Sequence, residues 1–499
     1  MSKIAIIGAG FSGLSAAAYL AAGGNEVHVF EKNETAGGRA RQLKTKQGYV
    51  FDMGPSWYWM PDVFERFFKD FGYKVSDVYD LKLLDPSFEV VFAKGKRIPI
   101  PADYSALKNL FENIESGSAA KLDKFMEEAK HKYETGMENL VYMPGNSMSE
   151  FADPKIIKKA FRLQIFSSFS KHVRKYFSNP QLIALMEFPV LFLGAMPQET
   201  PALYSLMNYA GLKLGTWYPM NGGFGKVIES IKEICEEKGV SFHFNSPVEK
   251  IIVEENCAKS LIVNGVKMDF DAVIASADYH HVEKDLLPDG YKNYNEDYWE
   301  KKTFAPSSLI FYIGLSKKIK SISHHTLFFE EDLFQHSVEI YRSPEWPSRP
   351  LFYVCCPSQT DDTVAPEGHE NLFLLMPIAP GLEDNENLRA KYFEIMLNRL
   401  ENHIGEKIES FIDYKKSYCI NDFIEDYHAY KGNAYGLANT LRQTAFLKPK
   451  IRNKKIKNLF YAGQLTVPGP GVPPSLISGK VASKELLKYL KNKKHEINI

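Results

Sequence analysis

The chain has 499 residues, too many for one ordinary hydrophobic core, so we expect at least two packed units. Hydrophobic residues make up 44% and charged residues 24%, which excludes wholesale disorder and a polytopic membrane protein. The 61 basic residues balance 61 acidic ones, so no overall positive field attracts nucleic acid. We therefore expect a soluble protein without a nucleic-acid partner.

The cysteines and the apolar segments indicate the cellular compartment of the protein. The five cysteines form no CxxC motif and no paired-histidine spacing, so we expect neither a metal site nor a disulfide framework. The apolar run 4–7 lacks the basic leader and cleavage site of a signal peptide, which favours a strand. Residues 182–196 are interrupted by Glu187 and Pro189 and fall short of the about 20 residues that cross a bilayer. These features predict a cytosolic protein without a membrane-spanning segment.

A strand, a glycine-rich turn and a helix follow one another at the start of the chain. The apolar run 4–7 is followed by Gly8, Gly10 and Gly13 and by an alanine-rich helical pattern over 14–22. In a dinucleotide-binding turn, the first glycine permits the turn, the second lets backbone approach a pyrophosphate, and the third allows close helix packing. The helix N-terminus then presents free N–H groups to the phosphates. This context predicts a bound dinucleotide.

An acidic residue at the end of the next strand supports this interpretation. Residues 27–30 are typical of a strand, and Glu31 stands 18 residues past Gly13, where a carboxylate accepts the ribose hydroxyls. The glycine pattern alone is weak evidence. The complete series of strand, turn, helix and acid outweighs a coincidental glycine turn.

Two further segments separate flavin from nicotinamide. Residues 32–39, Lys-Asn-Glu-Thr-Ala-Gly-Gly-Arg, resemble the extension after the second strand in the class of FAD enzymes that includes amine oxidases and carotenoid desaturases. The resemblance implies that Gly38 and Arg39 lie beside the flavin pyrophosphate and ribityl chain. Residues 49–56 match a second segment of that class, in which Gly54 lets the chain pass against the isoalloxazine ring. The alternative is that Gly54 only permits a turn of the chain.

The pattern then becomes helical. Apolar residues at helical spacing predict helices over 63–71 and 119–133. Residues 158–177 predict one basic, aromatic amphipathic helix, which either lies in a membrane interface or, as is commoner, covers the core of its own domain. Six of the ten residues in 448–457 are basic, and we expect a solvated loop there.

The chain next returns to the flavin unit. Residues 217–225, a helix over 227–238 and a strand over 240–244 resemble the return segment of the same FAD enzymes. The resemblance places the backbone of Val248 against the adenine. Residues 271–278 read as an apolar strand that ends in a polar loop, and we expect this strand at the closing edge of the dinucleotide-binding sheet.

A second unit with a sheet is expected between residues 307 and 435. Apolar strand-like runs cover 309–315, 351–356 and 372–377, and a helical pattern covers 388–404. Such a unit can form a wall over the flavin and enclose a mostly apolar pocket.

The C-terminal segments carry the most specific resemblance. Residues 458–463 read as a strand that enters a turn at Gly463, and residues 464–475 contain Pro-Gly-Pro-Gly-Val. Together with Gly-Asn-Ala-Tyr-Gly-Leu at 432–437, this resembles the signature of bacterial-type phytoene dehydrogenases, the carotenoid desaturases. Gln-Leu-Thr-Val at 464–467 departs from the smaller residues and the polar group that many members carry, which leaves the substrate and reaction open within the family.

The chemistry of such a reaction agrees with the absence of a catalytic triad. Carbons that bear no polar group lose a hydride only to a redox cofactor. The carbocation that remains then releases a proton to a weak base or to water. The helix near Pro474 is expected to direct the N–H groups of Gly471 and Val472 at the N1/O2 edge of the flavin, stabilising the reduced form. We predict that these backbone groups, and no ionisable side chain, support catalysis.

The sequence therefore predicts an α/β fold with a Rossmann-type FAD-binding domain like that of the amine oxidases. This domain is expected to comprise residues 1–90, 217–290 and 432–499. An inserted α+β substrate domain, with a mixed sheet and a helical region, is expected over 91–216 and 291–431.

The predicted function is FAD-dependent desaturation of a linear carotenoid that is drawn from a membrane surface by a peripherally associated protein. Phytoene-type desaturation and 3,4-desaturation of a 1-hydroxycarotenoid both stay open, as does the terminal electron acceptor. Two alternatives share the fold: a flavin amine oxidase, and a non-catalytic prenyl-binding escort protein of the Rab GDP-dissociation inhibitor type.

Overall fold

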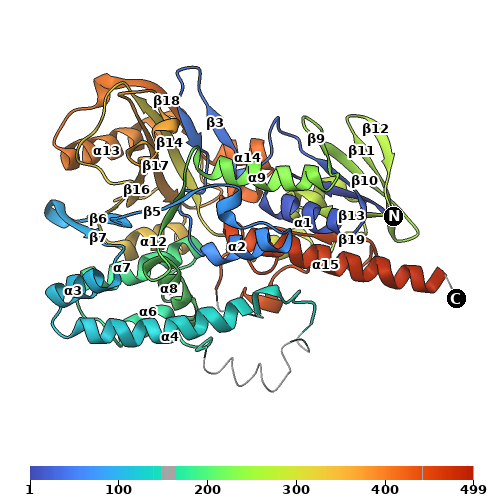
Figure 1. Ribbon diagram of the computed structural model, residues 1–499, viewed down its shortest axis with the longest axis horizontal. Helices are drawn as coiled ribbons and strands as arrows, with labels where there is room; N and C mark the ends of the chain where they lie inside the picture. The colour runs from blue at the N-terminus through green and yellow to red at the C-terminus, as the bar shows by residue number, and fades with distance from the viewer. Residues whose placement is uncertain (139, 148–149, 151–162, 441, 498–499) are drawn as a thin grey trace.

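The computed structural model describes residues 1–138, 140–147, 150, 163–440 and 442–497. A parallel sheet with its helices and a larger mixed sheet lie at opposite ends of the long axis, and a group of helices lies below the mixed sheet (Figure 1). The fold class is the predicted one: a Rossmann-type α/β unit combined with an α+β unit.

The parallel sheet has five strands in the order β19-β13-β1-β2-β9, and every neighbouring pair is parallel. The strands are β1 (Lys3–Ile7), β2 (Glu26–Phe30), β9 (Ser241–His243), β13 (Ala272–Ala275) and β19 (Leu459–Tyr461). Each predicted strand of this sheet is present. The expected position of β13 was wrong, because β19 pairs with it on the outside and takes the edge.

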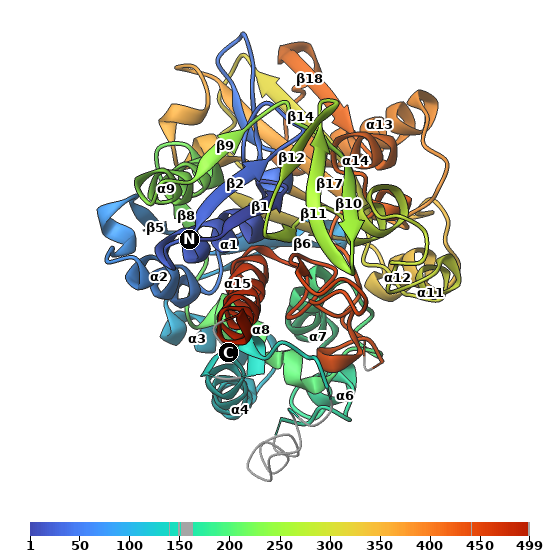
Figure 2. The ribbon, with the colours of Figure 1, turned by 90° about the vertical axis from the view of Figure 1, so that its right-hand side faces the viewer.

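Both faces of this sheet are buried, which explains the continuous apolar run of β1. Ile4 and Ile6 pack toward α1 (Phe11–Ala22), α9 (Gly223–Glu237) and α15 (Val472–Ile497). Ala5 and Ile7 pack toward an antiparallel sheet. Its strands are β10 (Val248–Glu254), β11 (Cys257–Val263) and β12 (Val266–Asp269) (Figure 2).

Gly13 holds α1 against the glycine turn. A Cβ at Gly13 would lie 2.0 Å from the carbonyl oxygen of Gly8, whereas a Cβ at Gly10 would meet nothing closer than 3.9 Å. We therefore expect Gly13→Ala to lower the free energy of unfolding by about 3 kcal/mol or more, since backbone must move, and Gly10→Ala to leave it nearly unchanged. Urea unfolding of both variants checks this, and equal midpoints would contradict the packing role of Gly13.

The larger sheet has seven strands in the order β18-β14-β17-β16-β15-β6-β7. Only β15 and β6 are parallel among its neighbouring pairs. The strands are β6 (Phe88–Phe92), β7 (Lys96–Ile100), β14 (Ser307–Leu315), β15 (His325–Phe329), β16 (Phe352–Cys355), β17 (Glu370–Ile378) and β18 (Ile412–Tyr418). Strand β6 crosses residue 90, the predicted end of the first segment of the FAD-binding domain.

The predicted helix α13 (Glu386–Ile404) packs its apolar side on one face of this sheet. The remaining described α-helices belong to both parts of the molecule: α2 (Pro61–Asp70), α3 (Tyr104–Ile114), α4 (Ser118–Glu138), α6 (Phe169–Val173), α7 (Pro180–Glu187), α8 (Leu206–Leu212), α10 (Tyr279–His281), α11 (Glu296–Glu300), α12 (Leu333–Tyr341) and α14 (Ile420–Tyr427). Short two-stranded ribbons join β3 (Gln42–Lys44) to β4 (Val50–Asp52) and β5 (Leu81–Leu83) to β8 (Trp217–Pro219).

The prediction of one amphipathic helix over 158–177 is wrong for the residues of this range that the structure describes. Residues 158–162 lie outside the described residues, residues 163–168 form turns, and α6 has only five residues. The chain breaks here because Ser168 pairs with Pro201 and caps α6 with its hydroxyl. Phe169 and Val173 are buried, so this part of the aromatic face serves the core.

The basic run 448–457 is only partly solvated, contrary to expectation. Lys454, Lys455 and Lys457 are exposed, but Lys448 is buried, and this burial lowers the pKa of its ammonium group to about 7. Among the described residues, no helix is both long and apolar enough to cross a membrane.

Candidate cofactor and substrate site

One large pocket lies between the carboxyl ends of the parallel strands and a face of the seven-stranded sheet. Ligands of open parallel sheets bind at such strand ends. Ten of the eleven residues predicted for the cofactor line this pocket: Gly8, Gly10, Glu31, Gly38, Arg39, Gly54, Val248, Gly463, Gly471 and Val472. Gly13 does not line it and acts through packing.

The glycine turn forms a backbone cradle at the start of α1. Gly10 is the N-cap of α1, and its backbone bridges to Gly37. A Cβ on Gly38 would lie 3.1 Å from the Cα of Gly10, so the two backbones face each other without side chains between them. The helix N-terminus adds a positive partial charge. This cradle suits a pyrophosphate.

Glu31 is buried at the end of β2, where it holds the turn together. Its Oε2 accepts the N–H of Ala9 at 2.8 Å, and its Oε1 accepts the backbone and side-chain N–H groups of Asn33 at 2.9 Å. Val248 lies in the same pocket beside Pro247 and Phe30. An acidic group and an apolar slot therefore adjoin the cradle, as an adenosine moiety requires.

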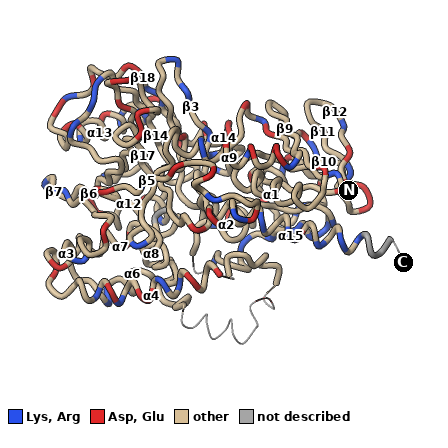
Figure 3. Tube along the Cα trace, in the orientation of Figure 1, with Lys and Arg blue, Asp and Glu red and all other residues tan. Residues whose placement is uncertain are grey.

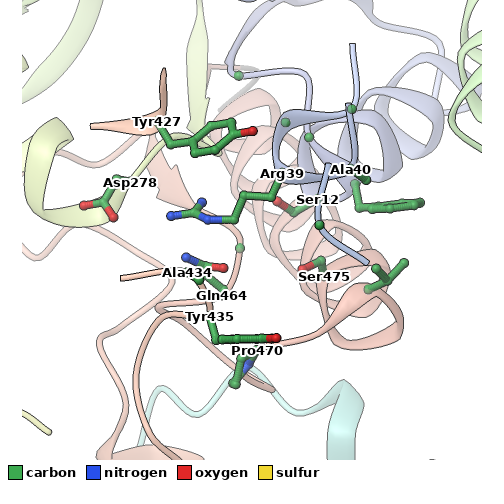
Figure 4. A pocket seen from close by; sticks show the side chains of 18 of the residues that line it. Ser12, Arg39, Ala40, Asp278, Tyr427, Ala434, Tyr435, Gln464, Pro470 and Ser475 are labelled. Atoms are coloured by element: carbon green, nitrogen blue, oxygen red, sulfur yellow. The ribbon is translucent and has the colours of Figure 1, made fainter. Parts of the chain in front are cut away.

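Arg39 projects into the middle of the pocket (Figure 4). Its Nη2 donates to the carbonyl of Asn433 at 3.3 Å, and its guanidinium lies 5.0 Å from the ring centre of Tyr427. With the amide oxygen turned toward the guanidinium, Gln464 accepts from Nη2 at 3.0 Å. The Arg39 Nε is buried and finds no hydrogen-bond partner among the described residues. A buried donor of this kind suits an anionic or polar ligand.

Asp278 lies opposite Arg39 in the same view (Figure 4). Its Oδ1 accepts the N–H groups of His280 and His281 at 3.0 and 3.3 Å. Burial raises the pKa of this carboxyl, and the charge of Arg39 opposes the rise. Burial conversely lowers the pKa of the Arg39 guanidinium.

Several pocket residues were missed by the sequence analysis. Asp278 stands three residues after the end of β13, so the rule that the loops after strand ends line ligand sites could have identified it. Gln464 follows β19 in the same way but was noted only as a departure from the family pattern. Tyr435 lies in the segment 432–437 that resembles the family signature but was not assigned to the site, and Tyr427 on α14 carries no comparable local signal.

The start of α15 directs backbone toward the pocket. Gly471 adopts φ +113°, a left-handed conformation that favours glycine, and Val472 begins the helix. Pro473 and Pro474 have no N–H, so Gly471 and Val472 supply the N–H donors at this end of the helix.

The far side of the pocket is an apolar wall on the seven-stranded sheet. Tyr353, Leu375 and Ile310 stand side by side on β16, β17 and β14, and all three line the pocket. Trp57 and Met207 line it as well. The site thus joins a dinucleotide cradle to a space for an apolar ligand, and its residues fit FAD together with such a ligand.

Comparison with known proteins agrees with this geometry. Residues 11–487 match the family described as flavin containing amine oxidoreductase. A carotenoid 3,4-desaturase of Haloarcula japonica is 41% identical over 97% of this chain and 98% of that relative. A zeta-carotene-forming phytoene desaturase of Myxococcus xanthus is 30% identical over 98% of this chain and 94% of that relative.

A solved structure supports the fold at lower identity. An oxidoreductase from Methanosarcina mazei superposes with a TM-score of 0.61 at 18% identity, covering 97% of this chain and all of that one. The family match and the two sequence relatives span nearly the whole chain. This chain therefore belongs to the flavin-containing amine oxidoreductases, and among them to the carotenoid desaturases, with FAD as its cofactor.

Proposed function

We propose that this protein is an FAD-dependent desaturase that removes hydrogen from a linear carotenoid. One observation carries the proposal: a single pocket joins the backbone cradle at Gly10 and Gly38 to the apolar wall of Tyr353, Leu375 and Ile310. The two sequence relatives are named as carotenoid desaturases, which favours this function over an amine oxidase or a prenyl-binding escort protein.

The chain's own residues have distinct tasks in this proposal. Gly10, Gly38 and the N-terminus of α1 hold the pyrophosphate, Glu31 holds the ribose, and Arg39 lies beside the ribityl chain. Bound FAD supplies the hydride acceptor. The N–H groups of Gly471 and Val472 stabilise negative charge that develops near them.

The apolar wall offers no obvious general base. The carboxylates and histidines of the pocket lining are Glu31, Asp278, His281, Asp426 and His428, and none of them lies on the wall strands β14, β16 and β17. Tyr353 lies on the wall and Tyr435 in a nearby loop, and burial raises the pKa of both phenols, that of Tyr435 to about 12. Proton loss from the substrate is therefore assigned to water or to a weak base.

The function is tested by pigment analysis. The protein is produced in cells that accumulate phytoene, in cells that accumulate a 1-hydroxycarotenoid, and in cells without carotenoids. We expect products with longer conjugation in one of the first two strains, and a purified protein whose flavin absorbance bleaches under dithionite. Unchanged pigments in both strains, with FAD bound, would exclude carotenoid desaturation while leaving the flavoprotein assignment intact.

We also propose that the protein associates peripherally with membranes, because its substrate is almost insoluble in water. Lys484, Lys488 and Lys491 are exposed and recur at helical spacing along α15. Figure 3 shows basic positions along this helix. In Figures 1 and 2, α4, α6 and α15 lie on the same side of the molecule. Phe166, three residues before α6, is 79% exposed. Basic residues with an exposed aromatic ring suit an anionic membrane surface.

Flotation with liposomes tests this association. Binding should be strongest with anionic lipid and weaken with salt, since each basic residue contributes about 1 kcal/mol that ions screen. Reversing two charges (Lys484→Glu with Lys488→Glu) should weaken binding at least tenfold. The matched reversal of the exposed Lys415 and Lys416 on β18 should have little effect. Equal loss in both double variants, or no flotation with any lipid, would contradict the proposed surface.

A further inference from the structure

Three side chains of types that bind metals meet beside the apolar wall, and Cys355 lies on the same face of the seven-stranded sheet as Tyr353. His325 begins β15, His324 directly precedes this strand, and Cys355 ends β16 opposite His325 in the strand register. All three are buried, and one ligand atom from each lies within 4.8 Å of the others. The sequence analysis excluded a metal site because no two of the cysteines and histidines follow a ligand spacing. The strand pairing, which spacing does not reveal, brings them together.

The two imidazoles are held in the way that metal-binding histidines are. Nδ1 of His324 lies 2.7 Å from the hydroxyl of Thr360, and Nδ1 of His325 lies 2.6 Å from the hydroxyl of Tyr353. In protein metal sites, such a bond from one ring nitrogen orients the other nitrogen toward the ion. Nε2 of both rings is buried and has no hydrogen-bond partner within the described part of the chain. Two buried imidazole nitrogens without a partner on adjacent residues call for a ligand.

A nearby carboxylate favours a cation. Oδ2 of Asp361 lies 3.4 Å from the hydroxyl of Tyr218, whose ring centre lies 4.7 Å from that of His324. This carboxylate, together with a thiolate ligand, would help to offset the charge of a divalent ion in this buried position.

We propose that His324, His325 and Cys355 form a binding site for a thiophilic divalent cation, with Zn²⁺ as the best match. Two imidazoles and one thiolate are ligands that Zn²⁺ prefers, and three protein ligands leave a fourth position for water or a nearby side chain. Binding releases the proton of the Cys355 thiol to solvent. The flavin site is separate from this one, so the proposal does not depend on the desaturase function.

The site would stiffen the substrate side of the pocket. The ring of His325 stacks on Trp57 with a centroid distance of 4.2 Å, and its partner Tyr353 also contacts the hydroxyl of Ser56 at 3.0 Å. Trp57, Tyr353 and Ser56 all line the pocket. A metal ion bound beside them would fix their positions.

Metal content of the FAD-loaded full chain tests the proposal. The protein is stripped with a chelator, titrated with Zn²⁺ or Co²⁺ alone, dialysed and analysed by mass spectrometry for metal. We expect one ion per chain, a thiolate-to-cobalt charge-transfer band with Co²⁺, and a higher Tm with Zn²⁺. Cys355→Ser should lose at least tenfold in affinity and the charge-transfer band. His324→Gln should lose affinity to a similar extent but keep the band at high Co²⁺.

The chain offers a matched control for the Cys355 variant. Cys356 is the next residue, equally buried, but its Sγ contacts Ser358 and Glu370 instead of the cluster. Cys356→Ser should therefore bind metal as the parent does. The proposal is overturned if the parent retains no ion, or if Cys355→Ser binds as tightly as Cys356→Ser. The titration of the parent protein uses no variant, so its result can overturn the proposal even if a variant misfolds.

Discussion

Replacing Gly10 with valine is expected to yield a folded protein that purifies without FAD and has no desaturase activity. The backbone of Gly10 has an ordinary φ of −75°, and a Cβ there would meet no atom closer than 3.9 Å, so the protein itself tolerates a side chain. That side chain would instead occupy the space beside Gly38 that the pyrophosphate requires. The loss should be specific to the cofactor.

The ratio of flavin absorbance to protein absorbance measures this effect after identical purification. Gly136→Ala on α4 is a matched control, since a Cβ at Gly136 also meets nothing closer than 3.9 Å but lies away from the pocket lining. The control should retain full FAD. Equal flavin content in Gly10→Val and the parent would refute the assignment of the phosphate cradle.

Replacing Gly471 with valine is expected to reduce turnover severely while the protein still binds FAD. Gly471 has φ +113°, which a β-branched residue rarely adopts, and a Cβ there would lie 3.2 Å from Cδ of Pro474. The start of α15 must therefore shift, and its N–H groups move with it. Each lost donor could cost about 3 kcal/mol of stabilisation, or roughly a hundredfold in rate.

The rate of flavin reduction by substrate under anaerobic conditions measures this loss. Gly290→Val is a matched control, because Gly290 has φ +90° and open space around it but does not line the pocket. Its rate should stay close to that of the parent. Single substitutions of the carboxylates and histidines in the proposed substrate domain should also be tolerated. One such variant that binds FAD and substrate but never reduces the flavin would reveal a general base and disprove this mechanism.

Local patterns predicted the flavin-binding elements well. The strand, turn and helix formed by β1, the glycines and α1 are confirmed, as are β2, α9, β19 and α15. These elements are encoded by neighbouring residues: strands by continuous apolar runs, turns by glycine, helices by periodic apolar residues. Ten of the eleven predicted residues line one pocket for the same reason, since parallel strand ends and the loops that follow them meet at one edge.

Local patterns failed where burial depends on distant partners. The charge run at 448–457 predicted a solvated loop, yet packing buries Lys448. The periodicity over 158–177 predicted one continuous helix. The described part of this range is not one helix, because the pairing of Ser168 with Pro201 interrupts it. A propensity summed over neighbouring residues contains no information about such partners.

The FAD-binding motifs, the order of the elements and the family could be predicted from the amino-acid sequence, because each rests on residues close together in the chain. Three features became visible only in the folded chain: β19 takes the edge beside β13, Tyr427 and Asp278 surround Arg39, and paired strands place His325 opposite Cys355. These contacts join residues that are far apart in the chain. Long-range packing and strand register set them, and neither can be read from a local pattern.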